Sequence, residues 1–135
     1  MNNVKNSIPK LRELAMEAAT KAYSPYSLAK VGSSVLTEDG EIFSGCNIEN
    51  SSYGGTVCAE RVAIFKAVSS GCKGISALYV YSEEGWPPCG ICRQVLSEFA
   101  SEKLTIIIGD KGGNEKIVNF TDFFPMAFTP EHIKK

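Results

Sequence analysis

The stretch from Cys58 to Ile108, CAERVAIFKAVSSGCKGISALYVYSEEGWPPCGICRQVLSEFASEKLTIII, decides the fold. Apolar side chains recur at helical spacing in two of its segments, and the first segment ends at Gly71, a residue that favours a helix C-terminus. Two short apolar runs, one between the segments and one after them, are typical of buried strands. The expected helices cover residues 58–70 and 89–100, and the expected strands cover residues 75–81 and 104–108. Strands that alternate with helices in this way favour an α/β sheet covered by helices.

The flanking segments extend the same architecture. An amphipathic helix is expected over residues 8–22, with Ser7 as its N-cap and Pro9 in its first turn, where proline is tolerated. The turn Glu38-Asp39-Gly40 predicts a hairpin between two strand-like runs. These runs cover residues 31–36 and 42–48, and a weaker strand is expected near Ile117. We therefore predict one domain over residues 1–135, with a mixed sheet in a three-layer α/β/α arrangement.

Composition excludes several classes of function. The chain has 14 basic and 15 acidic residues and no basic run, so a nucleic acid polymer is not the expected substrate. We expect no signal peptide and no membrane span, since the polar N-terminus is not followed by an apolar run. The cytoplasm is therefore the expected location. In such a chain, five cysteines with a Cys-x-x-Cys spacing favour metal binding over a disulfide framework.

Two short runs carry the chemistry, Cys58-Ala59-Glu60 and Pro88-Cys89-Gly90-Ile91-Cys92. Cys89 and Cys92 are about one helical turn apart, so both can face one ion, and Cys58 can complete a three-thiolate zinc site. Both runs fall at expected helix N-termini, which favour thiolate over thiol. A zinc ion with three protein ligands keeps a position for water, and Glu60 is then the expected general acid/base.

A closed structural zinc site is the alternative, and it requires a fourth ligand. Cys46, Cys72 and His132 are the remaining candidates, and none of them stands out, which favours an open site. Arg61 lies three residues after Cys58 and can donate hydrogen bonds to the ligand sulfurs. A solvated surface arginine is the other interpretation of this residue.

These runs resemble the zinc-dependent cytidine deaminases. Further matches to that family are Gly45–Gly54 (GCNIENSSYG), Val57–Arg61 (VCAER), Cys92–Leu96 (CRQVL) and Phe123–Phe128 (FFPMAF). The resemblance covers roughly residues 8–133, with the motifs in the expected order. It implies the three-layer α/β/α fold of that family with a mixed five-stranded sheet. The short chain and the three cysteines resemble the small homotetrameric class.

The resemblance also implies roles for individual residues. Cys58, Cys89 and Cys92 would hold Zn²⁺, Glu60 would move the protons, and Arg61 would tune the thiolates. The substrate-binding residues would be Asn47 and Glu49 at the ribose hydroxyls, Ala59 in the pocket, and Phe128 over the base, in a neighbouring subunit's site. The reaction would be the deamination of cytidine or deoxycytidine to uridine or deoxyuridine plus ammonia, in pyrimidine salvage.

One departure from the family pattern concerns the base pocket. The family usually has phenylalanine where Ser24–Gly32 (SPYSLAKVG) has Ala29, and Ser33 and Ser34 replace two alanines. Trp86 either refills the pocket or covers the surface, and we expect the latter. The hypothesis is that the enzyme accepts a bulkier or modified cytosine nucleoside, or turns over plain cytidine poorly. The alternatives are a deaminase of another nucleoside or a nucleoside antibiotic, and a catalytically weak, zinc-stabilised nucleoside-binding relic.

Overall fold

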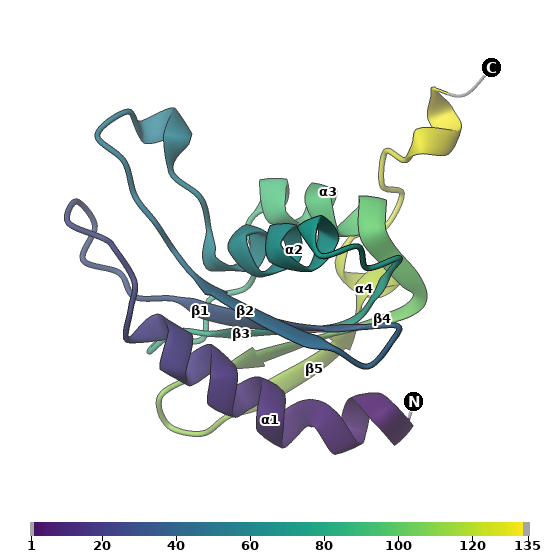
Figure 1. Cartoon of the computed structure of the whole chain (residues 1–135), viewed down its shortest axis with the longest axis horizontal. Coiled ribbons are helices and arrows are strands. Elements are labelled where there is room, and N and C mark those ends of the chain that lie inside the picture. Colours follow the sequence, from purple (N-terminus) through teal and green to yellow (C-terminus); the bar gives the residue numbers. More distant parts are fainter. Residues whose placement is uncertain (1, 134–135) are drawn as a thin grey trace.

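A computed structural model describes residues 2–133 and shows a five-stranded sheet between two helical layers (Figure 1). The strands lie in the order β2-β1-β3-β4-β5. Strand β1 is antiparallel to β2 and β3, β3 is parallel to β4, and β4 is antiparallel to β5, so the predicted mixed sheet is confirmed. The helices are α1 (Asn2–Ala19), α2 (Ala59–Ser69), α3 (Gly90–Phe99) and α4 (Phe120–Phe123), and the strands are β1 (Gly32–Thr37), β2 (Ile42–Cys46), β3 (Ile75–Tyr81), β4 (Ala100–Gly109) and β5 (Glu115–Asn119). Two 3₁₀ turns cover Tyr53–Gly55 and Pro130–His132.

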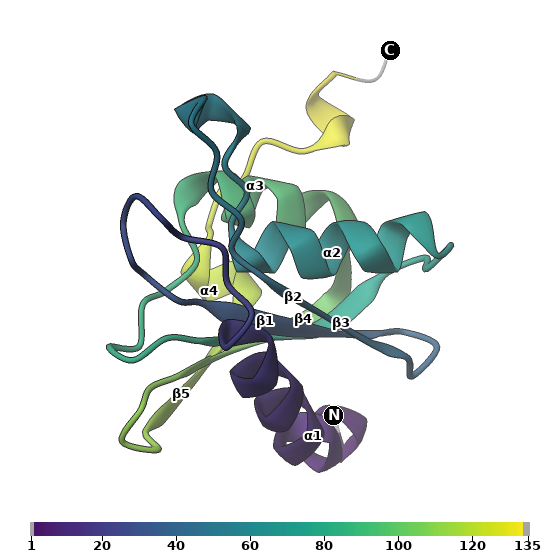
Figure 2. The same cartoon turned by 60° about the vertical axis from the view of Figure 1, so that its left-hand side comes forward.

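Helix α1 covers one face of the sheet, and α2 and α3 cover the other (Figures 1 and 2). The central strand β3 contributes side chains to the cores on both faces of the sheet, because successive side chains of a strand point to opposite sides. Leu78 and Val80 belong to the core beneath α2 and α3, whereas Ala77 and Tyr79 belong to the core beneath α1. This burial on both faces explains why the strand is apolar except at Ser76.

Two glycines set how closely the helices approach the sheet. A Cβ on Gly32 of β1 would lie 1.8 Å from the carbonyl oxygen of Ala15, in α1. A Cβ on Gly45 of β2 would lie 2.7 Å from the backbone nitrogen of Ala63, in α2. Both contacts are to backbone atoms, so neither helix could keep its position against a larger residue.

The predicted start of the first helix is wrong. Helix α1 begins at Asn2, so Ser7 lies inside it, and Pro9 is an interior residue rather than a first-turn one. The apolar stripe continues past the proline, since Val4 packs with Ile8 and Leu11 against the sheet. The helix ends at Ala19 rather than at residue 22, ahead of the turn at Ser24-Pro25.

The two serines that depart from the family pattern are buried and bound to backbone. The Ser33 hydroxyl donates to the carbonyl oxygen of Tyr79, and the Ser34 hydroxyl donates to that of Leu11, each at 2.7 Å. Their hydroxyls therefore link β1 to β3 and to α1.

Among residues 2–133, no helix has both the length and the apolar character needed to cross a bilayer.

Candidate active site

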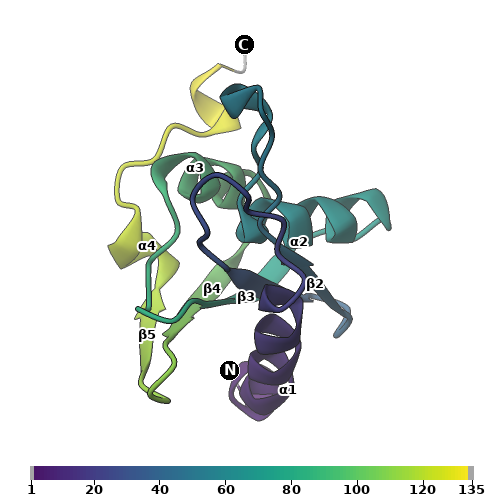
Figure 3. The ribbon, with the colours of Figure 1, turned by 90° about the vertical axis from the view of Figure 1, so that its left-hand side faces the viewer.

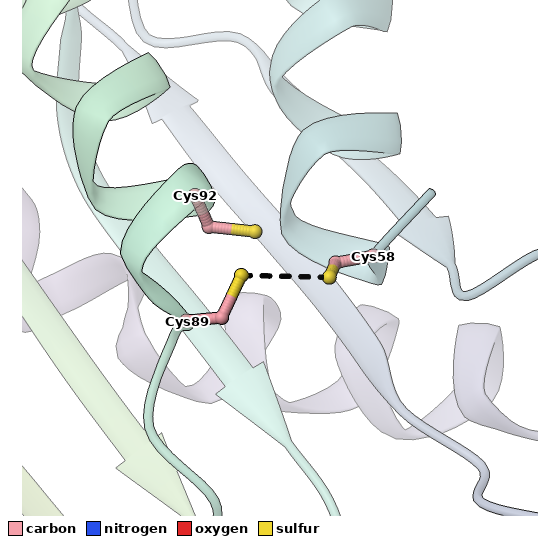
Figure 4. A group of neighbouring side chains, drawn as sticks. All are labelled: Cys58, Cys89 and Cys92. Atoms are coloured by element: carbon pink, nitrogen blue, oxygen red, sulfur yellow. Dashed lines mark hydrogen bonds between the residues drawn. The ribbon is translucent and has the colours of Figure 1, made fainter. Parts of the chain in front are cut away.

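The three predicted ligands meet where two helices begin. Cys58 is the N-cap residue of α2, Cys89 is the N-cap residue of α3, and Cys92 lies in the first turn of α3. Their sulfur atoms all lie within 4.8 Å of one another, and Cys58 Sγ is 3.8 Å from Cys89 Sγ (Figure 4). Neither N-cap side chain makes a capping hydrogen bond, so both sulfurs remain directed toward the cluster.

Topology explains this meeting point. Strand β3 ends at Tyr81 and leads through a loop into α3, so α3 begins near the carboxyl end of β3. Helix α2 leads back to the start of β3, and its own N-terminus therefore lies at the same end of the sheet (Figure 3). Ligand sites in open α/β sheets form outside the carboxyl ends of the strands.

The pKa values of Cys58 and Cys92 are shifted in opposite directions, and both shifts arise within the cluster. Hydrogen bonding from Cys92 and from Arg61 lowers the pKa of Cys58 to about 5, and the same contact with Cys58 raises the pKa of Cys92. Arg61 Nη2 donates to Cys58 Sγ at 3.5 Å. Zinc binds thiolates, so its binding would displace the proton that Cys92 retains.

No fourth protein ligand joins the cluster within residues 2–133. Cys46 Sγ donates to the carbonyl oxygen of Lys21 at 3.5 Å, and His132 Nδ1 accepts a hydrogen bond from the backbone N–H of Thr129 at 3.0 Å. Three soft sulfur donors at this spacing suit zinc with one position left for a small molecule.

Glu60 lies beside the cluster in the first turn of α2. The residue is 4% exposed, and its Oε1 has no hydrogen-bond partner in the part of the chain described here. Burial, together with the nearby charge of Cys58, raises the pKa of Glu60 to about 7, although Arg61 opposes this shift. A buried carboxyl group without a partner is costly and is characteristic of a functional site.

A cavity of about 260 Å³ connects the cluster to Asn47, Glu49 and Ala59. Three predicted metal and catalytic residues, Cys58, Glu60 and Cys89, line it together with both predicted ribose ligands. We refer to this space as the site cavity. It is lined by Ser27, Ala29, Val31, Asn47, Glu49, Thr56, Val57, Cys58, Ala59, Glu60, Val80, Trp86, Pro87 and Cys89. Trp86 was expected to cover the surface, but it forms part of this wall.

Asn47 and Glu49 also line the site cavity. Asn47 Oδ1 accepts from the N–H of Val31, and its Nδ2 donates to the carbonyl oxygen of Ala29, both at 2.9 Å. Glu49 accepts hydrogen bonds from the backbone of Tyr26 and from the N–H and hydroxyl of Ser27. Each side chain still has hydrogen-bonding capacity left, one amide hydrogen on Asn47 and a lone pair on Glu49.

Phe128 does not line the site cavity of its own chain. It is 56% exposed and stacks on His132, with the ring centroids 5.4 Å apart. Gln94 Nε2, in α3, donates to the carbonyl oxygen of Phe128 at 2.8 Å and so ties the C-terminal segment to α3. This segment projects away from the sheet on the side of α2 and α3 (Figures 1 and 2).

Sequence reasoning did not identify the contribution of Arg93. Its Nε donates to the carbonyl oxygen of Pro88 at 2.9 Å, and its Nη1 donates to that of Phe123 at 3.1 Å. The guanidinium also lies 3.7 Å from the centroid of the Phe123 ring. Arg93 therefore fixes the residue that precedes Cys89 against the segment that follows β5. Its sequence signals were its position directly after Cys92 and its place in the family match Cys92–Leu96.

Comparison with known proteins places this site in a family. The family described as the cytidine and deoxycytidylate deaminase zinc-binding region matches residues 5–108. The cytidine deaminase of Sporosarcina psychrophila is 41% identical over 128 residues, which are 93% of this chain and 94% of that protein. The blasticidin-S deaminase of Bacillus cereus is 32% identical over 139 residues, covering 94% of this chain and 96% of that protein.

Solved structures agree with this result. The crystal structure of the cytidine deaminase from Burkholderia pseudomallei matches with a TM-score of 0.85 and 40% identity. The match covers 90% of this chain and 98% of that chain. Since the family match spans Glu60 and all three clustered cysteines, the chain belongs to the cytidine and deoxycytidylate deaminase family, whose members bind zinc.

Proposed function

We propose that this chain, as a single domain over residues 1–135, hydrolyses the amino group of cytidine or deoxycytidine. The products are uridine or deoxyuridine and ammonia, and the reaction serves pyrimidine salvage in the cytoplasm. The observation that carries the proposal is the buried carboxyl group of Glu60 beside three sulfurs, with one oxygen that has no partner in residues 2–133, in the same cavity as two polar residues that can bind a sugar. Relatives named cytidine deaminases support the choice of substrate.

Cys58, Cys89 and Cys92 hold zinc in this proposal, and Arg61 donates to the sulfur of Cys58. Zinc bound there supplies Lewis-acid activation of water. Glu60 accepts a proton from the attacking water as its oxygen bonds to C4 of the cytosine, and donates a proton to N3. Glu60 then takes the remaining proton from the hydroxyl on C4 and delivers it to the amino nitrogen as the bond between C4 and that nitrogen breaks, so that ammonia leaves and C4 keeps its oxygen as the carbonyl of uridine.

The proposal places the sugar against Asn47 and Glu49, through the hydrogen-bonding capacity that their contacts with residues 26–31 leave free. Ala59, which is fully buried, forms the floor beside Glu60. Phe128 closes the site of a neighbouring copy in a homotetramer. The exposure of Met126, Phe128 and Ile133, at 100%, 56% and 68%, supports an apolar contact made by the C-terminal segment.

Deamination of cytidine by the purified, zinc-loaded protein tests the proposal. Ammonia release and the absorbance change from cytidine to uridine should both appear, should stop when a chelator removes zinc, and should return when zinc is restored. A chain that binds stoichiometric zinc and folds, yet releases no ammonia from any nucleoside, would instead be a nucleoside-binding relic.

A second candidate is a deaminase of a nucleoside antibiotic. The small side chain of Ala29 in the cavity wall favours it, as does the similarity along nearly the whole chain to a protein named blasticidin-S deaminase. Comparing kcat/KM for cytidine and for blasticidin S under the same conditions distinguishes the two. A higher value for cytidine supports the first candidate.

A further inference from the structure

Cys89 is the most exposed of the three clustered cysteines, at the start of α3 (Figure 4). Cys92 is buried, and Cys58 is half-buried. The residue before Cys58 is Val57, which forms an antiparallel bridge through two backbone hydrogen bonds. The residue before Cys89 is Pro88, which has no N–H to donate to such a bridge. The sulfur of Cys89 therefore depends on other contacts to stay beside its two neighbours.

Arg93 binds the peptide groups on both sides of Cys89. The carbonyl oxygen of Pro88, in the preceding peptide group, accepts a hydrogen bond from Arg93 Nε at 2.9 Å. The carbonyl oxygen of Cys89, in the following peptide group, accepts one from the backbone N–H of Arg93 at 3.0 Å. Because a peptide group is planar, holding both of them fixes the backbone angles of Cys89 and the direction of its Cα–Cβ bond. One residue thus sets the region that the sulfur of Cys89 can reach.

The bond to Pro88 is well protected. Pro88 is fully buried, and a hydrogen bond is stronger where water is excluded. Arg93 Nε is part of a planar group with several donors in a rigid fork, so the same side chain can bind a second acceptor without releasing the first.

The second acceptor belongs to α4. Arg93 Nη1 donates to the carbonyl oxygen of Phe123 at 3.1 Å, and the guanidinium carbon lies 3.7 Å from the centroid of the Phe123 ring. Phe123 ends α4, and Phe120 at the start of this helix is buried in the core beneath α2 and α3. The guanidinium is therefore held by a segment that is itself anchored in the core, and it transfers this support to the start of α3.

The next residue of α3 separates two effects. Gln94 Nε2 donates to the carbonyl oxygen of Phe128, so Gln94 and Arg93 both tie α3 to the C-terminal part of the chain. The other side-chain contact of Gln94 is with Ser97, further along the same helix. Of these two neighbours, Arg93 is the one whose side chain holds the peptide group before Cys89.

We propose that Arg93 is a positioning residue for the metal centre, which keeps the sulfur of Cys89 in the geometry that a shared ion requires. Unlike Arg61, Arg93 makes no hydrogen bond to the three sulfurs within residues 2–133, so it acts through the backbone of Cys89. The inference rests on the zinc ligands of the proposed function and is independent of which nucleoside the enzyme takes. It makes α4 part of the support of the metal site.

The test loads the purified protein with Co²⁺ in place of zinc, because thiolate-to-cobalt charge transfer reports how many sulfurs bind the ion. Arg93→Met keeps an unbranched side chain and removes every side-chain donor. Its charge-transfer absorbance per cobalt should fall toward about two thirds of the unmodified value, the share of two thiolates in three. Its zinc affinity, measured by chelator competition, should be about tenfold to a hundredfold lower. At saturating zinc, kcat for cytidine should fall while KM stays within about twofold, because the contacts proposed for the sugar are unchanged.

Gln94→Met is the matched control, since it removes the tie to Phe128 and leaves Pro88 bound. Its cobalt spectrum and zinc affinity should equal those of the unmodified protein. Arg93→Lys keeps the charge and one donor nitrogen but not the planar fork, so its zinc affinity should lie between those of the unmodified protein and Arg93→Met. The lysine variant also serves as the test if Arg93→Met does not fold.

An unchanged cobalt spectrum and zinc affinity in Arg93→Met, or in Arg93→Lys if the first variant does not fold, would overturn the inference. Equal losses in Arg93→Met and Gln94→Met would also overturn it, because the tie to the C-terminal segment would then explain both. If the unmodified protein itself lacks the three-thiolate cobalt spectrum, the proposed zinc site fails together with this inference. The three-thiolate spectrum and the losses in Arg93→Met, without deamination of any nucleoside, would contradict the proposed function alone.

Discussion

The proposed chemistry depends above all on one residue, Glu60. A carboxyl group that is 4% exposed, with an oxygen that has no partner in residues 2–133, costs the fold free energy that an apolar residue would not. The fold tolerates this cost next to three sulfurs, in the wall of the site cavity. A structural zinc site would gain nothing from such a residue, so its presence argues for turnover.

Glu60→Gln should lower kcat for cytidine by about a hundredfold or more, because the amide keeps the shape but cannot carry the proton. Zinc content, measured on the purified variant, should stay at the level of the unmodified protein, since the three cysteines are unchanged. Glu98→Gln, on the exposed side of α3, serves as the matched control and should retain full activity. A Glu60→Gln enzyme with nearly normal kcat would remove Glu60 from the mechanism.

Helix α2 brings Cys58 and Glu60 to the site, and its position depends on Gly45. Gly45→Ala would place a methyl group 2.7 Å from the backbone of Ala63, so α2 must move away from β2. We expect a loss of about 1–3 kcal/mol in the free energy of unfolding, together with weaker zinc binding. Denaturant unfolding and chelator competition measure the two effects.

Gly54→Ala is the control for this substitution, because nothing lies within 4 Å of the Cβ that it adds. Its stability and zinc affinity should match those of the unmodified chain. If Gly45→Ala also left stability and zinc affinity unchanged, the approach of α2 to β2 would not set the geometry of the cluster.

Periodicity made most elements predictable. The buried strand β3 and the helices that carry the cysteines follow local sequence patterns. The metal ligands and Glu60 were also predictable, because short spacings within the runs Cys58–Glu60 and Cys89–Cys92 mark them. The extension of α1 to Asn2 could not be predicted in this way, because it depends on Val4 finding a place against the sheet.

The parts of the site that escaped prediction join segments distant in sequence. The contacts of Asn47 with residues 29 and 31 and the bond of Arg93 to Phe123 have no local signature. The same holds for the place of Trp86 in the cavity wall. Each depends on how loops meet after the sheet has formed, and tertiary packing alone decides that.

At the scale of the molecule, one cluster ties the α1 layer to the sheet. Arg12 of α1 donates to Glu115 of β5 through Nε at 2.5 Å and Nη2 at 2.9 Å, and the Tyr79 hydroxyl of β3 donates to the same carboxylate. These contacts, above all the bond from Arg12, lower the pKa of Glu115 below its ordinary value of 4.5. The cluster therefore links folding stability to pH.

Glu115→Gln should lower the melting temperature at pH 7. A carboxyl group whose pKa is lower in the folded state stabilises the fold above its unfolded pKa, and this contribution is lost as the pH falls through the folded pKa. The difference in melting temperature between the two proteins should therefore be constant near neutral pH and shrink below about pH 4.5. Glu13→Gln, on the exposed side of α1, should show no such pH-dependent difference. A difference that stays constant down to pH 3 would mean that packing, and not charge, explains the effect.

The position of the C-terminal segment bears on whether one site contains residues from more than one copy of the chain. Phe128 lies outside the site cavity of its own chain, and Met126 is fully exposed. If Phe128 closes a neighbouring copy's site, Phe128→Ala and Glu60→Gln damage different components of each site. Either variant alone should then be strongly impaired in kcat/KM, with every copy carrying the same defect.

Hybrids of the two variants test whether Phe128 acts in the site of a neighbouring copy. Chains co-expressed as hybrids contain sites in which an intact Glu60 faces an intact Phe128 from another copy, and these sites should recover activity well above the average of the two parents. Light scattering should show the hybrids at the same mass as the unmodified protein, four times that of the chain under the proposed homotetramer. The parents mixed without subunit exchange should stay at their average. If each site were built by one chain, every hybrid site would carry one of the two defects. Activity would then never exceed the average of the parents, and Phe128 would have no part in a neighbour's chemistry.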